Sequence, residues 1–430
     1  MVLLGSTRIR SSASRPARAI LLILRRRVPD HFRPDTVLLK QAVLVLLFCG
    51  IIDLFPGFFL GRFDHVLSTI PGLLIILPPT VGLRGNIFGA LAARLGSKLH
   101  LGTIEPRFRR NRELKVQLGA ASVQLLFLSV LIPVLAEVVG RLFGISVGNV
   151  HDLLFISITG AIISGILMFG ITFGVSFLSF RRGWDPDNVS TPIVATTGDL
   201  LTVPVLFACA WLALEIPEMA TVLISGTLLI LIVLLSGAMA LRGRGISREI
   251  LREALPVAMV AVLISTFSGL VLGASFDALL TGTVFLIMVP ALNGQGGNMG
   301  SVLGSRVTSS AYLGQNKLSF RPNDLAVSSG VSLWLISLIV FILIIGGGGI
   351  LLGLITGVEV PHIMEIFVIM VLGATLITAV TSAVAYYIAF FSFKLGLDPD
   401  NTVIPILTAC MDVVGSGSLI IVLLVMGVLF

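Results

Sequence analysis

Charged residues are scarce in this sequence. They make up 12% of its 430 residues, whereas hydrophobic residues make up 56%. Soluble domains carry about 25% charged residues, so the composition excludes an ordinary soluble protein. Apolar stretches of roughly 20 residues, the length that crosses a bilayer as a helix, recur from residue 41 to the end. The composition therefore predicts an all-α polytopic membrane protein.

Cysteine and histidine are also scarce, and neither is arranged for metal or redox chemistry. The three cysteines lie far apart in apolar sequence, and no CxxC pair occurs. No thiolate zinc site or dithiol redox motif is therefore indicated. The sequence also lacks HExxH, GxSxG and a glycine-rich phosphate loop before a lysine. We predict that the chain is not an enzyme.

Positive charge exceeds negative charge, and the formal net charge is +7. Most lysines and arginines fall in short loops between apolar stretches, which the positive-inside rule assigns to the cytosolic side. The excess is thus explained without nucleic acid as a partner. Residues 1–40 form a tail with eight arginines and no acid before Asp30. We expect a cytosolic tail that lies on anionic lipid, and an organelle transit peptide is the alternative.

The sequence contains an internal duplication. Residues 78–94 carry a proline, two glycines, an asparagine and an arginine that recur 212 positions later, as at Asn86 and Asn298 (298 − 86). The signature Asp-Pro-Asp-Asn at 185–188 recurs 213 positions later at 398–401, and both copies precede a proline and an aspartate. Either motif alone is weak. Their recurrence in one order at nearly one offset indicates that the chain is duplicated.

The duplication predicts about 11 transmembrane helices, arranged as two parallel five-helix repeats joined by one linking helix. The expected parts are a basic cytosolic tail (1–40), a first repeat (41–215), a linking helix and loop (216–252) and a second repeat (253–430). Five crossings would invert the second repeat, so the linking helix restores the parallel orientation. We expect a multi-pass protein of the cell membrane, with a cytosolic N-terminus and an external C-terminus. The two halves of one chain are expected to act together like a dimer, so the protein could work as a monomer.

The second span of each repeat contains prolines and clustered glycines, at 77–86 and 289–300. These residues predict a broken helix, and irregular backbone inside a membrane is tolerated only against protein or a watery cavity. We expect the broken spans and the fifth spans to line a path through the protein. The residues expected along it are Gly82, Asn86, Gly294, Asn298, Pro192 and Pro405. The alternative is that the glycines only permit close helix packing.

Asp199 and Asp412 are the candidate ion ligands. Each lies 14 residues after the first Asp of its Asp-Pro-Asp-Asn copy (199 − 185 and 412 − 398), inside an apolar span. A carboxylate in a membrane helix costs on the order of 2.5–3.5 kcal/mol. A pseudo-twofold axis brings the two face to face, and a cation between them removes their repulsion. Nearby oxygen donors favour Mg²⁺ over zinc or copper. The alternative is a helix–helix hydrogen bond.

Other polar residues are interpreted as structural. The Asp-Pro-Asp-Asn segments suit helix starts, because Asp and Asn are good N-caps. Asp53 lies in an apolar span, but its counterpart is Ser265 (53 + 212), so we expect it near the outer surface rather than in the ion site. We expect Arg94 and Arg306 to anchor the cytosolic end of each broken helix.

With these motifs, the chain resembles the MgtE-type magnesium transporters, in particular the tandem-fused solute carrier branch. The likeness rests on the Pro…Gly…Gly-Asn segment and the Asp-Pro…Pro…Asp pattern, each present twice. It implies a pore between the halves and Mg²⁺ at Asp199 and Asp412. It also implies that backbone carbonyls one turn earlier, at Ala195 and Thr408, help to hold the hydrated ion. The cytosolic helical and CBS domains of bacterial MgtE have no counterpart here, so their gating is not carried over.

The predicted function is therefore transport of Mg²⁺, and of other divalent cations that accept oxygen ligands, through a pore between two repeats. Arg84, which replaces Gly296 of the second repeat, supports a rival interpretation. In that alternative the chain is a secondary carrier for an organic or anionic solute, and the aspartates relay protons. A cation/Mg²⁺ exchanger using Na⁺ or H⁺ is a further alternative.

Overall fold

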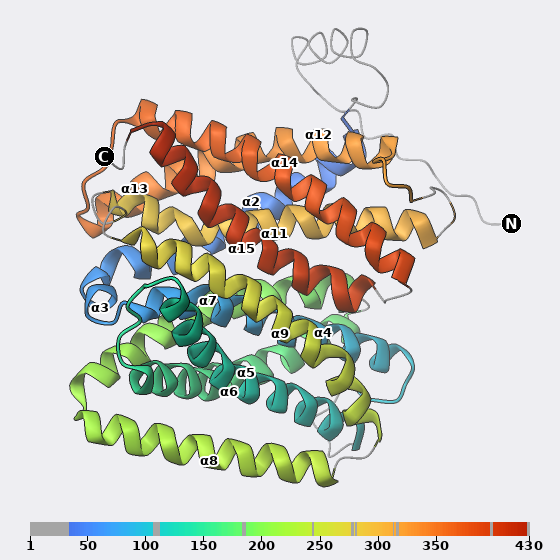
Figure 1. Cartoon of the computed structure of the whole chain (residues 1–430). Helices are drawn as coiled ribbons and strands as arrows, with labels where there is room; N and C mark the ends of the chain where they lie inside the picture. Colours follow the sequence, from blue (N-terminus) through green and yellow to red (C-terminus); the bar gives the residue numbers. More distant parts are fainter. Residues whose placement is uncertain are drawn as a thin grey trace, which may run out of the picture.

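The computed structural model of the chain describes residues 34–105, 112–182, 186–242, 245–276, 279, 282–312, 314, 318–395 and 399–427 (Figure 1). These residues form helices and short connections, without strands. Most of the basic tail and the first residues of both Asp-Pro-Asp-Asn segments lie outside this description. The fold class expected from the sequence, an all-α polytopic membrane protein, is confirmed.

The helices follow the order expected for two repeats and a link. The first repeat contains α2 (Thr36–Arg62), α3 (Asp64–Thr69), α4 (Gly72–His100), α5 (Arg112–Leu142), α6 (Val150–Arg181) and α7 (Pro186–Glu215). The linking helix is α8 (Glu218–Arg242). The second repeat contains α9 (Gly245–Ala274), α11 (Thr283–Tyr312), α12 (Asp324–Ile339), η2 (Val340–Gly346), α13 (Gly347–Thr356), α14 (Ile363–Leu395) and α15 (Pro399–Val425).

Nine spans within the described ranges are long and apolar enough to cross a membrane. The other two of the eleven helices that the sequence predicts correspond to α8 and α11, which are not among these nine. The linking helix α8 contains a shorter apolar stretch, Glu218–Leu234. Helix α11 has 30 residues, the length of a membrane span, but contains many Gly, Asn, Gln and Ser residues. A helix this polar is sheltered by its neighbours, and α11 packs against α2, α14 and α15.

The burial pattern repeats with the sequence. Each buried residue of α12 has a buried counterpart in α5 at an offset of 212, as in Leu333 and Ala121. Each buried residue of α14 has a buried counterpart in α6 at an offset of 213, as in Thr378 and Gly165. A stripe of buried positions fixes how a helix is rotated towards its neighbours. The third and fourth helices of the two repeats therefore present corresponding faces to the protein.

The first helix of each repeat packs against the other repeat. Helix α2 packs on α11, and α9 packs on α4; in Figure 1 the blue α2 lies among the orange helices. A Cβ atom on Gly57 of α2 would overlap the carbonyl oxygen of Ile287, and one on Gly269 of α9 would overlap that of Ile75. These two contacts are equivalent, since both partners are related by an offset of 212. Small residues at both crossings let the backbones touch.

The expected breaks in the second spans are not present. Both α4 and α11 are continuous helices through 77–86 and 289–300, although they contain Pro78, Pro79 and Pro290. Prolines are tolerated in membrane helices because neighbouring helices and Ser or Thr side chains satisfy the freed backbone groups. In α4, the Thr80 hydroxyl directly after the two prolines donates to the Ile76 carbonyl at 2.5 Å, an additional bond within the helix. The glycines of α4 and α11 let side chains of neighbouring helices approach the helix backbone, and they do not unwind the helix.

The third span of the second repeat contains one irregular turn that the sequence pattern did not predict. The span is helical throughout 324–356, but Val340–Gly346 has π-helical hydrogen bonding and is followed by three more glycines. A π-turn adds a residue to the helix and rotates the part that follows it. Helix α13 therefore continues α12 but is rotated about the helix axis. In this part of the span, Gly349 packs against Met288 of α11.

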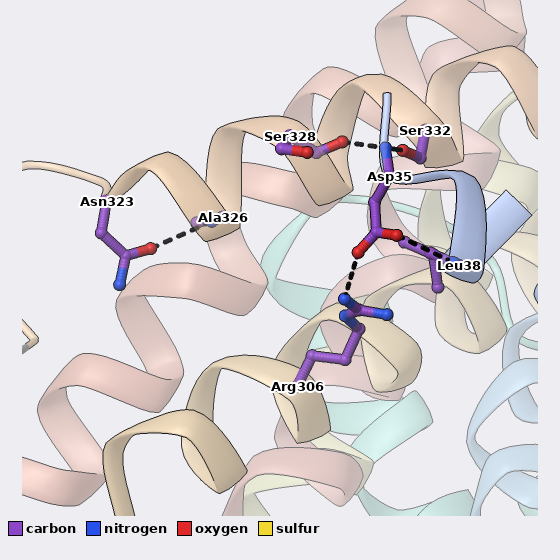
Figure 2. A network of polar contacts seen from close by, with 7 residues as sticks. All are labelled: Asp35, Leu38, Arg306, Asn323, Ala326, Ser328 and Ser332. Carbon is purple, nitrogen blue, oxygen red and sulfur yellow. Dashed lines mark hydrogen bonds and ion pairs between the residues drawn. The ribbon is translucent and has the colours of Figure 1, made fainter. Parts of the chain in front are cut away.

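The two expected anchoring arginines are tied to different partners. Arg94 on α4 donates through Nε to Gln117 Oε1 of α5 at 2.9 Å. Arg306 on α11 forms an ion pair with Asp35, just before α2, with Nη2 2.5 Å from Oδ2 (Figure 2). The Asp35 carboxylate also accepts from the Leu38 N–H at 3.2 Å, and its own N–H donates to Ser332 Oγ at 2.6 Å. The start of α2 is thus held on the second repeat.

Candidate cation site

Helices α7 and α15 carry the two predicted aspartates at corresponding depths. Each helix begins at the proline of its Asp-Pro-Asp-Asn segment, a residue suited to the first helical position. The prediction that these segments start helices is confirmed. Asp199 and Asp412 follow 13 residues later (199 − 186 and 412 − 399), or about 20 Å along the helix axis. Both carboxylates therefore lie well inside the membrane-length helices.

The structure brings both aspartates to one face of α4. A Cβ atom on Gly85 would lie 3.4 Å from Asp199 Oδ1, and one on Gly82 would lie 3.5 Å from Asp412 Oδ2. Glycines three positions apart are neighbours on a helix surface. Asp199 comes from α7 of the same repeat, whereas Asp412 comes from α15 of the other repeat. A helix of the first half is thus approached by the equivalent carboxylates of both halves.

The Asp412 carboxylate is supported by hydroxyl groups of the crossed-over helix α9. Ser265 Oγ donates to Asp412 Oδ2 at 2.6 Å, and Ser268 Oγ donates to the Asp412 backbone carbonyl at 2.8 Å. Ser268 Oγ also lies 3.0 Å from Ser416 Oγ, one turn further along α15. These bonds fix the rotamer and leave the second carboxylate oxygen for another partner.

Charge is concentrated around Asp199. This carboxylate interacts electrostatically with Asp53 and, less strongly, with Asp412. Within the described ranges, however, no three His, Cys, Asp or Glu side chains are close enough to ligate one metal ion directly. Any ion here would meet one or two carboxylates and complete its coordination with water or amide and carbonyl oxygens.

The remaining predicted residues lie around the same helices. Thr408 Oγ1 of the second repeat lies 3.4 Å from Asn86 Oδ1 of the first, and it also donates to the Pro405 carbonyl at 3.1 Å. The Ala195 carbonyl would be 3.9 Å from a Cβ on Gly85. Pro192 belongs to α7, but its side chain is outside the description.

Asp53 is the polar residue that sequence reasoning misplaced. It is only 4% exposed, and α2 brings it to Gly294 and Asn298 of α11, both expected along the path. The sequence led us to expect it near the outer surface rather than in the ion site, whereas the structure buries it against α11 beside these two residues. The sequence does contain a signal for Asp53, since a carboxylate in an apolar span is costly and therefore indicates a functional role. Its counterpart in the second repeat, Ser265, is not acidic, so comparison of the repeats does not point to Asp53.

Arg84 points away from both aspartates. Its guanidinium is buried, with Nε donating to Ser164 Oγ of α6 at 2.5 Å and Nη1 donating to the Thr80 carbonyl at 3.1 Å. Gly82 and Gly85 face the carboxylates, so Arg84 occupies the opposite side of α4. A cation in this position does not stand in a path along the glycine face. The carrier interpretation loses the residue that supported it.

These features define a multi-pass, all-helical membrane protein formed by duplication, with carboxylates at equivalent depths in its two halves. The chain belongs to the MgtE family of divalent cation transporters. The family model matches it twice, at residues 77–209 and 289–422, which are again 212 and 213 positions apart. It is therefore a transporter by family, in agreement with the prediction that it is not an enzyme.

Several solute carriers resemble the chain over most of its length. Solute carrier family 41 member 2 of Gallus gallus is 26% identical over 411 residues, covering 90% of this chain and 70% of the relative. Member 3 of Mus musculus is 26% identical, covering 88% of this chain and 80% of the relative. Member 2 of Homo sapiens is also 26% identical, covering 89% and 69%. No solved structure matches the chain.

Proposed function

We propose that this protein transports Mg²⁺ across a membrane, with the ion held between Asp199 and Asp412 in a pathway between the two repeats. One observation carries the proposal: equivalent carboxylates of both halves approach one face of α4, at Gly85 and Gly82. Two anions facing each other at low dielectric are stable only with a cation between them or with one protonated. The family of divalent cation transporters makes the cation the fitting solution.

The ligand chemistry favours Mg²⁺ as the cargo. Mg²⁺ binds oxygen, keeps several of its waters and uses one or two carboxylates. The site offers the two aspartates, the amides of Asn86 and Asn298 and the carbonyls of Ala195 and Thr408. Histidine and cysteine, which zinc and copper prefer, are not among these ligands. Mn²⁺ and Co²⁺ accept the same oxygens and are expected to pass as well.

The proposed path runs along the glycine faces of α4 and α11. Gly82 and Gly294 are equivalent residues, and each lies against an acidic side chain from a neighbouring helix. Glycines add no side chain to this path, and Pro192 and Pro405 lie at the entrances of the fifth helices. A membrane potential of 100 mV, negative inside, favours inward movement of a divalent ion by about 4.6 kcal/mol.

Flux of Mg²⁺ into liposomes that contain the purified protein tests this function. The parent is expected to pass Mg²⁺. Asp199→Asn and Asp412→Asn are each expected to lower the flux by at least about tenfold, the effect of losing about 1.4 kcal/mol of ion stabilisation. Asp324→Asn, at the exposed start of α12, is the matched control and is expected to conduct like the parent. Parent-like flux in both site variants would contradict the proposal.

A further inference from the structure

Asp53 is a buried carboxylate beside the proposed ion pathway, whose two paired aspartates are only partly buried, and the proposed ion site does not include it. A Cβ atom on Gly294 would lie 2.6 Å from Asp53 Oδ2, so the carboxylate rests directly on the α11 backbone. We propose that Asp53 determines the preference of the pathway for divalent over monovalent cations, an inference that rests on the proposed Mg²⁺ transport. Asp53 acts from α2, the helix that crosses from the first repeat to the second.

Asp53 belongs to the same electrostatic environment as Asp199. Asp53 and Asp412 both lie close enough to Asp199 to interact with it electrostatically. Cys49, one turn before Asp53 on α2, lies near both Asp53 and Asp199. Helix α2 also packs along α7. A cation at Asp199 therefore experiences the charge of Asp53 as well as that of the paired aspartate.

The hydrogen bonds around Asp53 leave oxygen atoms available. Gln295 Nε2 and Asn298 Nδ2 both lie 3.5 Å from Asp53 Oδ2, beyond the usual range for a strong bond. Gln295 Nε2 is nearer to the Leu46 carbonyl, at 3.1 Å. Gln295 Oε1 is buried without a hydrogen-bond partner in the structure. A buried acceptor without a donor is unfavourable. A cation, or a water molecule bound to it, would give both the Asp53 carboxylate and Gln295 Oε1 a partner.

The equivalent crossing in the other half shows that packing alone does not require this charge. The counterpart of Asp53 is Ser265, and the counterpart of Gln295 is Leu83 (both at 212). Ser265 donates to Asp412, so the second carboxylate receives a neutral hydroxyl where the first faces another acid. Both crossings keep the same glycine contacts at Gly57 and Gly269. An interface of this geometry therefore packs with Ser and Leu as well as with the acid and the amide.

Electrostatics connects this third charge to ion selection. The energy of an ion in a fixed field is proportional to its charge, so one added carboxylate stabilises a divalent cation twice as much as a monovalent one. The three acids do not form a direct three-carboxylate site among the described residues. Asp53 acts through the hydration shell of the ion, which Mg²⁺ retains. Loss of Asp53 should therefore weaken Mg²⁺ binding and increase competition by K⁺.

Liposome flux measured against Mg²⁺ concentration, with and without K⁺, tests the inference. Asp53→Asn and the double variant Asp53→Ser/Gln295→Leu are compared with the parent. The double variant copies the Ser and Leu of the equivalent crossing, which guards against loss of folding. Both are expected to raise the Mg²⁺ concentration for half-maximal flux by at least about tenfold. Both should also make flux sensitive to K⁺, with maximal flux changed less than about twofold.

Thermal stabilisation of the purified protein by Mg²⁺ gives a second measurement that does not depend on flux. The Asp53 variants are expected to need correspondingly more Mg²⁺ for the same shift in Tm, whereas Asp324→Asn is expected to match the parent. Parent-like half-saturation and no K⁺ effect in both Asp53 variants would overturn the inference. Failure of the proposed function looks different, since Asp199→Asn and Asp412→Asn would then also conduct Mg²⁺ like the parent.

Discussion

Arg84 carries a full positive charge on a helix that we propose lines a cation pathway. Its side chain is 1% exposed and is held by Ser164 and the Thr80 carbonyl, while Nη2 has no hydrogen-bond partner in the structure. No described acid forms an ion pair with it. A buried charge of this kind contributes little stability itself, but removing one of its partners is costly. Ser164 should therefore matter more for stability than Arg84 does.

We expect Ser164→Ala to lower the free energy of unfolding by about 1–3 kcal/mol, because it leaves the buried Nε of Arg84 without an acceptor. Adding Arg84→Met, which replaces the charge by an apolar chain of similar length, should recover most of this loss. Thermal unfolding of the parent and the two variants in detergent measures both effects. Equal Tm values for the parent and Ser164→Ala would show that this hydrogen bond does not support Arg84.

Asp53 and Arg84 show which residue-level features the sequence reveals. Both were recognisable as charges inside apolar spans. Their directions were not, because hydropathy and repeat motifs do not show which neighbour a side chain faces. Asp199 and Asp412 were easier to identify, since duplication supplied two copies of one signal. Asp53 has Ser265 in its place in the second repeat, so comparison of the repeats worked against it.

The crossing of α2 and α9 between the repeats is the principal feature at the scale of elements. Gly57 meets Ile287 and Gly269 meets Ile75 through backbone contacts, so neither crossing has room for a side chain. The ion pair of Arg306 with Asp35 holds the beginning of α2 in the same arrangement (Figure 2). Because α2 and α9 also bring Asp53 and Ser265 to the carboxylates, their placement couples packing to the candidate site.

Gly269→Ala is expected to destabilise the protein by about 1–3 kcal/mol, because its methyl group would overlap the Ile75 carbonyl. Gly226→Ala on α8 is the matched control, since a Cβ there meets nothing within 4 Å. This control should be neutral or stabilising by about 0.5–1 kcal/mol, owing to the better helix propensity of alanine. Thermal unfolding in detergent compares the two. Equal Tm values would contradict the tight crossing.

The helices were largely predictable from the sequence, but their partners and continuity were not. Apolar runs located most spans, and the repeat motif located α11, which is too polar to be found by hydropathy alone. The prolines and glycines at 77–86 and 289–300 suggested breaks because those residues disfavour isolated helices. In the packed protein, close contacts with neighbouring helices keep α4 and α11 continuous. The exchange of α2 and α9 depends on contacts between distant segments, which periodicity does not encode.

At the scale of the whole molecule, the duplication places two similar halves beside each other in one chain. The linking helix α8 packs on α5 and α6 of the first half, and Figure 1 shows it at the edge opposite α12 and α14. The two fused repeats thus form a pseudo-symmetric unit with one added helix. We propose that the halves are parallel in the membrane, with the N-terminus cytosolic and the C-terminus outside.

Labelling with a membrane-impermeant thiol reagent tests this orientation. In a cysteine-free background, Arg321→Cys is expected to lie on the cytosolic side and Glu359→Cys on the outer side, and both positions are exposed. The reagent added to intact cells should label only Glu359→Cys, because the positive-inside rule places Arg321 in the cytosol. Permeabilised cells provide the control, in which both should react. Labelling of Arg321→Cys in intact cells would reverse the proposed topology.

The position of a bound ion in crystals shows whether Asp199 and Asp412 hold the transported cation. Mn²⁺ accepts the same oxygen ligands as Mg²⁺, and its anomalous scattering identifies it in crystals of the protein. The account predicts an anomalous peak between the carboxylates of Asp199 and Asp412, and predicts its loss in Asp412→Asn crystals grown with the same Mn²⁺ concentration. Saturating Mn²⁺ that produces peaks only away from these two residues would contradict it.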